Sequence, residues 1–521
     1  MIEDVFENLV GQFSDPFTFY RELIQNAMDA GSGRVDVTVD WLEDQKMVLA
    51  TVADTGEGMT LDVIVSKLTR LFSSTKENDF TKIGKFGIGF VSVFAIVPEL
   101  VLVDTGREGE FYRVAFDGTT DFRILRLEMP IEGTSIRVYK RIRPQDLAEF
   151  ERRSLETIKF WCCHSENEIT FNGEVINEKL RVDSPCQFYY EGQGTEVVAG
   201  YTSSLQPAFA MYNQGLTLKV GYQEQFPGVT FKIKSRYLEH TLTRDNVLED
   251  ENYHKAMKLL ARVIREDLSA AFQKQVMELL RNYPETAAEL SHLMASAGAA
   301  LSRWRDYFPS SFAELPLFPV LHGPPQSIQQ ARAAAQSEEC VYVDSRPTEV
   351  SKRLHEEGIP VFWTSVDTSL AAGLEAVCGR PARSACASVA TPVPLDAPPT
   401  LRKIGWNVVA MLRRGKASVM KVQLADFDYE GSTISDRPCL VQRHLGEPVR
   451  LFERGFWSRL QVIPGVLLYN RRHPLVKKAL AQAEHSPLLA AFVLAKAALL
   501  QDGLPDKVEA RIAERAMSIK A

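Results

Sequence analysis

The pattern of apolar and polar positions over the first 150 residues predicts helices interspersed with short strands. The expected helices lie over 2–13 and 16–30 and near 144–162, and the expected strands lie at 35–39, at 47–54 and in several short runs within 100–139. Because most of these strands follow one another directly, without intervening helices, the order indicates an α+β sandwich and not a doubly wound parallel sheet.

The middle of the chain carries three further signals of secondary structure. Asn172-Gly173, between two strand-like runs, predicts a tight hairpin. A helix is expected over 249–280, and a strand–helix–strand unit over 340–364. The apolar residues that recur at helical spacing in the first of these are Leu260, Ile264, Leu268 and Phe272.

The chain is too long for a single core, because it has 521 residues. The turn-rich segment 391–399, TPVPLDAPP, is the clearest expected linker, and three helices are expected from Pro474 onward. We therefore predict three domains, at 1–150, 151–395 and 400–521, the second made of two α/β parts with a helical connection.

Composition narrows the function only slightly. Hydrophobic residues make up 45% and charged residues 24%, which is typical of a globular protein. The net charge of −7 gives no general attraction to nucleic acids. No stretch resembles a signal peptide or an apolar membrane span, so a cytoplasmic protein that binds no membrane is expected.

Seven cysteines are scattered along the chain, and only Cys162-Cys163-His164 forms a cluster. Adjacent cysteines fit poorly at two corners of one tetrahedral zinc site, and no second pair of ligands lies nearby in the sequence. Reduced, mostly buried thiols are the better interpretation.

The first motif with candidate catalytic or binding residues is RELIQNAMDA at 21–30. On a helix, Glu22, Asn26 and Asp29 lie at i, i+4 and i+7 and so share one face. A carboxylate there can activate a water, and an amide oxygen can reach a metal bound to phosphates. A solvated helix face is the alternative interpretation of the same pattern.

The second motif is DTGEGM at 54–59, directly after an expected strand. Asp54 at a strand end can accept a hydrogen bond from an amino group such as that of adenine, and the glycines let backbone approach a flat ring. An ordinary strand-to-helix turn would have the same composition.

The third motif is GKFGIGF at 84–90, ahead of the apolar run VSVFAIV. Glycines at this spacing let backbone N–H groups converge on phosphate oxygens at a helix N-terminus. The motif is neither a Walker loop nor a Rossmann fingerprint. A single glycine-rich loop is a weak signal, but three motifs in this order are difficult to obtain by chance.

Together these motifs resemble the nucleotide-binding boxes of the gyrase, chaperone, histidine-kinase and MutL (GHKL) ATPases, whose fold is the Bergerat α/β sandwich. The amino-acid sequences of the motifs are most similar to those of the ninety-kilodalton heat-shock chaperones, bacterial HtpG among them. FSSTK at 72–76 also resembles that family. The resemblance implies binding and hydrolysis of ATP with Mg²⁺.

The resemblance also implies a role for each matching residue. Glu22 would be the general base and Asn26 the Mg²⁺ ligand, whereas Asp29 is a candidate because the helical spacing puts it on the same face. Asp54 would recognise the adenine amino group with help from Thr134, and Gly58 and Met59 would line the adenine pocket. The implied phosphate-binding residues are Lys76, Gly84, Phe86, Gly87, Gly89 and Phe90.

Arg244, in FKIKSRYLEHTLTRDNVLED at 231–250, resembles the family's middle-domain arginine, which reaches the γ-phosphate when the domains close. An arginine that pairs with acidic residues at the helix start is the alternative. Thr241 and Leu248 depart from the family pattern.

Later segments continue the resemblance in order, at ISDRPCLVQ (434–442) and LLYNRRHPLVKKALAQAE (467–484). Residues 487–500 are apolar nearly all round, which fits either a core helix or part of a dimer interface. The family forms dimers through this region, so a homodimer through the C-terminal domain is expected. The chain opens at its first helix, with little room for the N-terminal strand that family members exchange between protomers, so the sequence leaves strand exchange open.

The leading interpretation is an ATP-dependent chaperone that remodels unfolded or partly folded client proteins. A dedicated ATP-gated switch for one partner would have the same motifs. A MutL- or gyrase-like enzyme linked to DNA is less favoured, because no nuclease motif or basic DNA-binding face is evident.

Overall fold

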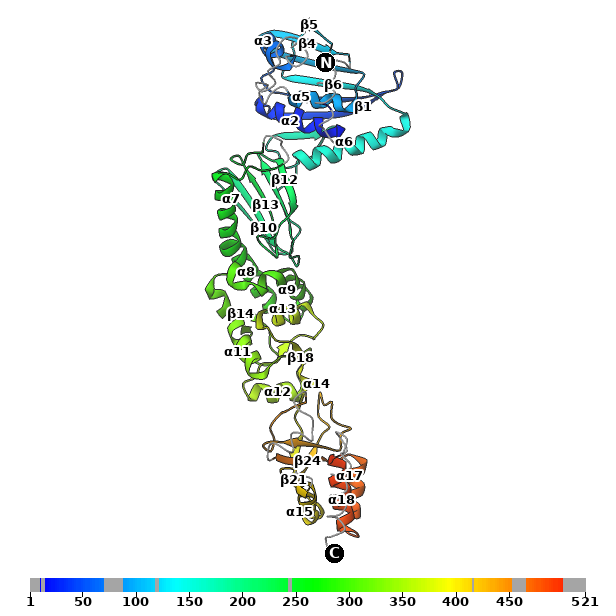
Figure 1. The fold of residues 1–521 in the computed structure, drawn as a ribbon, viewed down its shortest axis with the longest axis vertical. Helices are drawn as coiled ribbons and strands as arrows, with labels where there is room; N and C mark the ends of the chain where they lie inside the picture. The colour runs from blue at the N-terminus through cyan, green and yellow to red at the C-terminus, as the bar shows by residue number, and fades with distance from the viewer. Residues whose placement is uncertain are drawn as a thin grey trace. The chain divides into compact units, whose positions relative to one another are not determined.

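The computed structural model of the chain describes residues 10, 15–69, 88–117, 121–241, 246–414, 417–451 and 465–499. It divides into two compact units, one formed by 1–200 with 206–264 and the other by 201–205 with 265–521. Both units mix helices with sheets, which confirms the α+β class (Figure 1).

The first unit is built on an eight-stranded sheet of order β5-β4-β3-β6-β2-β1-β7-β8. Its strands are β1 Arg34–Leu42, β2 Met47–Asp54, β3 Leu100–Arg107, β4 Glu110–Phe116, β5 Phe122–Arg126, β6 Thr134–Arg141, β7 Glu168–Phe171 and β8 Glu174–Val175. The expected strands 35–39 and 47–54 and those within 100–139 are thereby confirmed. Strand β7 pairs in parallel with β1, so the sheet continues beyond residue 150.

Helices cover one face of this sheet, where Figure 1 shows α2, α5 and α6 together. The helical segments are η1 Pro16–Thr18, α2 Phe19–Asp29, α3 Leu61–Val63, η2 Ile64–Leu68, α5 Ile88–Val91, η4 Ser92–Ile96, η5 Pro144–Asp146 and α6 Leu147–Cys162. The apolar side of α2, including Leu23 and Ala27, is buried in the core as its spacing predicts. Of the expected helix 2–13, only Val10 lies within the described residues.

The hairpin predicted at Asn172-Gly173 joins β7 to β8. Both turn residues have positive φ, 48° and 88°, which is the backbone a two-residue type I′ turn requires. The Asn172 side chain also accepts a hydrogen bond from the Val39 N–H at 2.9 Å, which fixes the hairpin to β1.

A second sheet in this unit has the order β12-β11-β13-β10-β9. Its strands are β9 Gln187–Gly192, β10 Thr195–Tyr201, β11 Ala208–Asn213, β12 Leu216–Tyr222 and β13 Val229–Ser235, and helix α7 is Glu251–Arg262. The expected helix 249–280 is present as α7, the π-helical η6 (Val263–Leu268) and α8 (Ser269–Arg281) in succession, and residues from 265 onward belong to the second unit. Its four periodic apolar side chains are all buried.

The second unit begins with helical segments and three small sheets. The helical segments are α9 Ala287–Ser302, α10 Trp304–Tyr307, η7 Ser310–Glu314, α11 Ile328–Glu338, α12 Glu349–Glu356, α13 Ser369–Cys378 and α14 Ala385–Ser388. The strands are β14 Pro316–Phe318, β15 Gln326–Ser327, β16 Val341–Asp344, β17 Phe362–Trp363, β18 Ala382–Ser384, β19 Val389–Ala390 and β23 Val449–Arg450. Strands β16 and β17 are parallel and flank α12, which confirms the predicted strand–helix–strand unit.

A four-stranded sheet of order β20-β21-β24-β22 forms the end of this unit. Its elements are β20 Val393–Leu395, α15 Pro399–Arg414, β21 Val419–Asp426, β22 Cys439–Gln442, β24 Gly465–Asn470, α17 Pro474–Gln482 and α18 Pro487–Leu499. The linker expected at 391–399 is wrong for 393–395, because β20 pairs with β21. The third helix expected after Pro474 lies outside the described residues.

The apolar helix expected at 487–500 is α18. Most of its alanines and leucines are buried in one cluster with residues of α15, α17 and the sheet. Packing within the chain therefore accounts for much of its apolar character.

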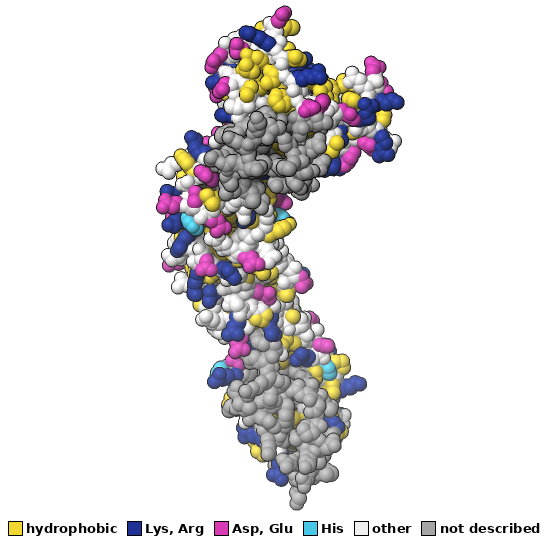
Figure 2. Space-filling view, turned by 45° about the horizontal axis from the view of Figure 1, so that its top comes forward, with side chains coloured by type: hydrophobic (Ala, Val, Ile, Leu, Met, Phe, Trp, Pro, Cys, Tyr) yellow, Lys and Arg dark blue, Asp and Glu magenta, His cyan; other side chains and the backbone are white. Residues whose placement is uncertain are grey.

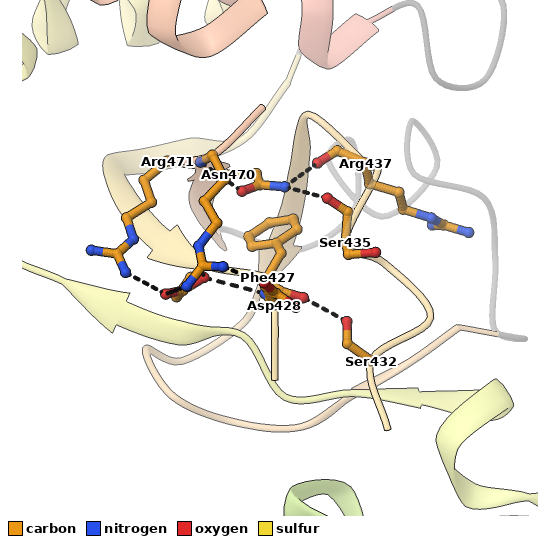
Figure 3. Close-up of polar contacts among 9 residues, drawn as sticks. Phe427, Asp428, Ser432, Ser435, Arg437, Asn470 and Arg471 are labelled. Atoms are coloured by element: carbon orange, nitrogen blue, oxygen red, sulfur yellow. Dashed lines mark hydrogen bonds and ion pairs between the residues drawn. The ribbon is translucent and has the colours of Figure 1, made fainter. Parts of the chain in front are cut away.

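A polar network closes the end of this sheet (Figure 3). The buried Asn470 donates from Nδ2 to the carbonyls of Ser435 and Arg437, at 2.8 and 3.1 Å. Asp426 accepts from Arg471 at 2.6 Å and lies 3.3 Å from Nε of Arg472. The carboxylate and the amide thus join the ends of β21 and β24 to the loop at 427–438.

Candidate nucleotide-binding site

The DTGEGM loop is fixed against the C-terminal end of α2. The N–H of Gly56 donates to Oδ1 of Asp54 at 2.8 Å, and the N–H of Glu57 donates to the carbonyl of Ala30 at 3.1 Å. A Cβ on Gly56 would lie 2.9 Å from the Cβ and carbonyl oxygen of Ala30. The glycine therefore allows the close approach that brings the first two motifs together.

Asp54 and Thr134 are directly paired across β2 and β6. Burial raises the pKa of the Asp54 carboxyl, while hydrogen bonds from the backbone N–H groups of Gly56 and Thr134 act in the opposite direction. A half-buried carboxylate with this cost of desolvation is suited to accept a hydrogen bond from a ligand amino group. The expected juxtaposition of Asp54 and Thr134 is present.

Gly58 and Met59 lie where the loop meets β3. Gly58 has φ +67°, and a Cβ there would be 2.1 Å from the carbonyl oxygen of Gly106. The N–H of Met59 donates to Oγ1 of Thr105 at 2.9 Å, and this hydroxyl lies 3.0 Å from that of Thr134. The backbone beside Asp54 is thus held by two strands.

Sequence reasoning missed Thr105. Its hydroxyl links Met59 to Thr134, and its side chain is fully buried. The available signal was Gly106, next to Thr105, because a glycine inside a strand often marks the close approach of another backbone.

Glu22 meets the third motif at Gly89. The glutamate is 6% exposed, and a Cβ on Gly89 would be 2.6 Å from its Oε2. A Cβ at this position would require the carboxylate to shift, so glycine allows α5 to approach it in the position observed. The structure therefore places Glu22 beside the short helix that follows the glycine-rich stretch.

Phe90, next to Gly89, lies in the core. Its ring is 4% exposed and its centroid is 5.4 Å from that of Phe116. Its backbone, and not its side chain, is the part that remains available for the predicted phosphate contact. Ser92 supports this turn by donating to the Gly89 carbonyl at 2.6 Å.

Asn26 and Asp29 follow Glu22 along α2 and are both exposed. On the face that these residues share, the Glu22 carboxylate is buried and the Asn26 amide is exposed. No cluster of three or more acidic, histidine or cysteine side chains suited to a metal occurs among the described residues. An exposed amide oxygen fits Mg²⁺ that is held mainly by nucleotide phosphates and water.

Five predicted site residues lie outside the described residues. They are Lys76, Gly84, Phe86, Gly87 and Arg244. Their roles stay predictions.

The cysteine cluster holds no pair of exposed thiols. Cys162 is buried, and burial raises the pKa of its thiol. His164 is occupied at both ring nitrogens, with the Glu178 carbonyl 2.9 Å from Nδ1 and the Lys232 ammonium 3.2 Å from Nε2. All seven cysteines are free.

Comparison with known proteins identifies the class of this site. Residues 18–118 match the family described as histidine kinase-, DNA gyrase B-, and HSP90-like ATPase. The chain thus carries a GHKL-type ATPase domain, which binds and hydrolyses ATP, generally with Mg²⁺. No helix in the described parts of the chain has the length and apolarity needed to cross a membrane.

More particular relatives are bacterial proteins named chaperone protein HtpG. That of Pseudoalteromonas translucida is 30% identical over 173 residues, covering 28% of this chain and 27% of the relative. That of Rhodospirillum rubrum is 27% identical over 196 residues, covering 31% and 30%. The similarity therefore spans less than a third of either relative.

Proposed function

We propose that this protein is an ATP-dependent chaperone of the HtpG type, a dimeric clamp that remodels client proteins. The observation that carries the proposal is the contact between the Glu22 carboxylate and Gly89, at the start of the helix after the glycine-rich loop. A general base at that point lies where a terminal phosphate and its attacking water would be held. The proposal that ATP is used for chaperone activity is based on the similarity to the HtpG relatives.

Each part of the site has a role in this proposal. Glu22 takes a proton from the attacking water, and Asn26 supplies an amide oxygen to Mg²⁺, which would neutralise phosphate charge. Asp54, Thr134 and the Gly58–Met59 backbone hold the adenine. The phosphates are assigned to Lys76 and the backbone of 84–90.

Domain closure would complete the site. Arg244 would neutralise charge on the γ-phosphate in the closed state, as an arginine finger does. The C-terminal domain would hold two protomers together, so that hydrolysis reopens the clamp. Clients are unfolded or partly folded proteins in this proposal.

Replacement of Glu22 tests the catalytic step. A Glu22→Ala protein should bind ATP with little change in affinity and hydrolyse it at least about 100-fold more slowly, because a positioned general base contributes that much. The exposed Glu174→Ala in β8 is the matched control and should leave both values unchanged. Normal turnover by Glu22→Ala would remove Glu22 from its role.

Assays with several unrelated proteins test the use of ATP. The chaperone should suppress aggregation of more than one thermally unfolded protein, and Glu22→Ala should alter the ATP dependence of that effect. Recovery of one stoichiometric partner on purification, with no effect on unrelated proteins, would favour a dedicated switch.

A further inference from the structure

Helix α15 presents an outer face that is basic and carries an exposed tryptophan. Over Pro399–Arg414 it has no aspartate or glutamate, and its exposed side chains after Pro399 are basic or aromatic. Trp406 is 71% exposed, although a side chain of this size is usually largely buried. The exposed cations of this face are Arg402, Lys403, Arg413 and Arg414.

Helical geometry brings these side chains onto one face. At 100° per residue, Arg402, Trp406 and Arg413 fall within about 40° of one another around the axis. Lys403 and Arg414 both lie about 60° to 80° further around the axis from Trp406. The opposite face of α15 is buried against the sheet, and Gly405 lies so close that a Cβ would be 2.8 Å from Val422.

In two other exposed helices, an arginine is neutralised within the helix. In α6, Arg152 lies 2.6 Å from both Glu149 and Glu156. In α12, Arg353 lies 3.1 Å from Glu356. Figure 2 likewise shows basic and acidic side chains interspersed over the described surface that it presents.

The cations of α15 lack such partners. Within the described part of the chain, Arg402, Lys403 and Arg414 form no ion pair. Arg413 donates from Nε to the Val419 carbonyl at 3.1 Å, which orients it without neutralising it. The helix dipole stabilises cations at the C-terminal end but not Arg402 and Lys403 near the start, so intrahelical electrostatics does not explain this arrangement.

We propose that this face, defined by the four cations and Trp406 and called here the α15 face, binds an acidic segment of a client protein that carries one apolar anchor. Carboxylates would pair with the cations, and the anchor would pack on the indole ring, a residue type common at the centre of interfaces. The site is distinct from the nucleotide site, and its occupant, a client protein, rests on the proposed function.

The spacing defines the segment. Arg402 and Arg413 are about 16 Å apart along the axis at 1.5 Å per residue. An extended peptide covers that distance in about five residues, and Trp406 lies about two residues from the Arg402 end. The fitting segment therefore has acidic residues about five positions apart, with an aromatic or large aliphatic residue between them.

An acidic peptide fits better than a nucleic acid. A single-strand binding groove usually has several aromatic platforms along a continuous basic track, whereas this face has one aromatic side chain between two pairs of cations. The net charge of −7 also gives no long-range attraction to a polyanion, so a short segment is favoured.

Fluorescence anisotropy with the full chain tests the proposal. The probe is a labelled peptide with aspartates at the stated spacing and a phenylalanine between them; its controls carry asparagines in place of the aspartates, or alanine in place of phenylalanine. Binding of the probe should weaken at least about tenfold in Trp406→Ala and in Arg402→Glu/Arg413→Glu, and fall as salt rises. Lys477→Glu/Lys478→Glu, a basic pair on α17, is the matched control and should change affinity less than about twofold.

Further arms of the experiment separate the alternatives. Glu22→Ala should retain peptide binding, so that failure of the ATPase proposal and failure of this one are distinguishable. Circular dichroism should show that Trp406→Ala is folded, because the side chain is exposed. The proposal is overturned by unaltered binding in Trp406→Ala, by no measurable peptide binding, or by tighter binding of an oligothymidylate than of the peptide.

Discussion

At the scale of single residues, glycines determine how closely the nucleotide-binding motifs approach one another. Gly56 lies against α2, Gly58 against the backbone of β3, and Gly89 against the Glu22 carboxylate. Each contact leaves no room for a Cβ without movement. The position of the Glu22 carboxylate therefore depends on the absence of a side chain at Gly89.

Gly89→Ala tests this positioning. A Cβ 2.6 Å from Oε2 of Glu22 must displace the carboxylate, and a displacement of about 1 Å can lower turnover by about 100-fold. We expect slow hydrolysis with ATP affinity changed by much less, measured by steady-state kinetics and calorimetry. Gly33→Ala, where a Cβ meets nothing within 4 Å, should behave as the unchanged protein. Equal kinetics for both variants would contradict the positioning role of Gly89.

At the scale of elements, local periodicity predicted most of the helices and strands that form the site. Helix α2 and strand β2 have strong patterns, because one side of each packs on a core. Strand β20 was missed, since VPL between prolines resembles a linker and its pairing with β21 is not encoded locally. The Glu22–Gly89 and Met59–Thr105 contacts join residues far apart in the chain. The motifs predicted that Glu22 and Gly89 belong to one site, but not that they are in contact. They gave no indication of the contact between Met59 and Thr105.

The Asp426 network predicts acid sensitivity of the C-terminal sheet. Burial opposes ionisation of this carboxyl, but hydrogen bonds from the Asp428 N–H and Arg471 outweigh it and lower its pKa. A lowered folded-state pKa gives stability that is present above the unfolded value of about 4 and is lost as pH falls through the folded value.

Asp426→Asn should therefore lower stability at pH 7 and reduce the loss of stability below about pH 4. Urea unfolding at a series of pH values, followed by fluorescence, measures both effects. Asp436→Asn, at an exposed position of the adjoining loop, should match the unchanged protein. An identical pH dependence for Asp426→Asn would contradict the assignment of Asp426.

At the scale of the whole molecule, the proposed clamp requires two protomers. We expect the full chain to have the solution mass of a dimer, measured by light scattering, and a variant that ends at residue 388 to be monomeric and still bind ATP. Trp406→Ala should remain a dimer, because the α15 face is proposed for clients and not for the partner subunit. A monomeric full chain would contradict the clamp.

The parallel pairing of β7 with β1 has a consequence for recombination between relatives. Strand β7 follows α6 in the chain but pairs with 34–37 of β1, so the sheet includes residues from both sides of position 150. A chimera joined at 150 would place a foreign strand against β1, whereas one joined after Val175 would exchange the whole sheet. Viable crossovers in this lineage should cluster at the second position.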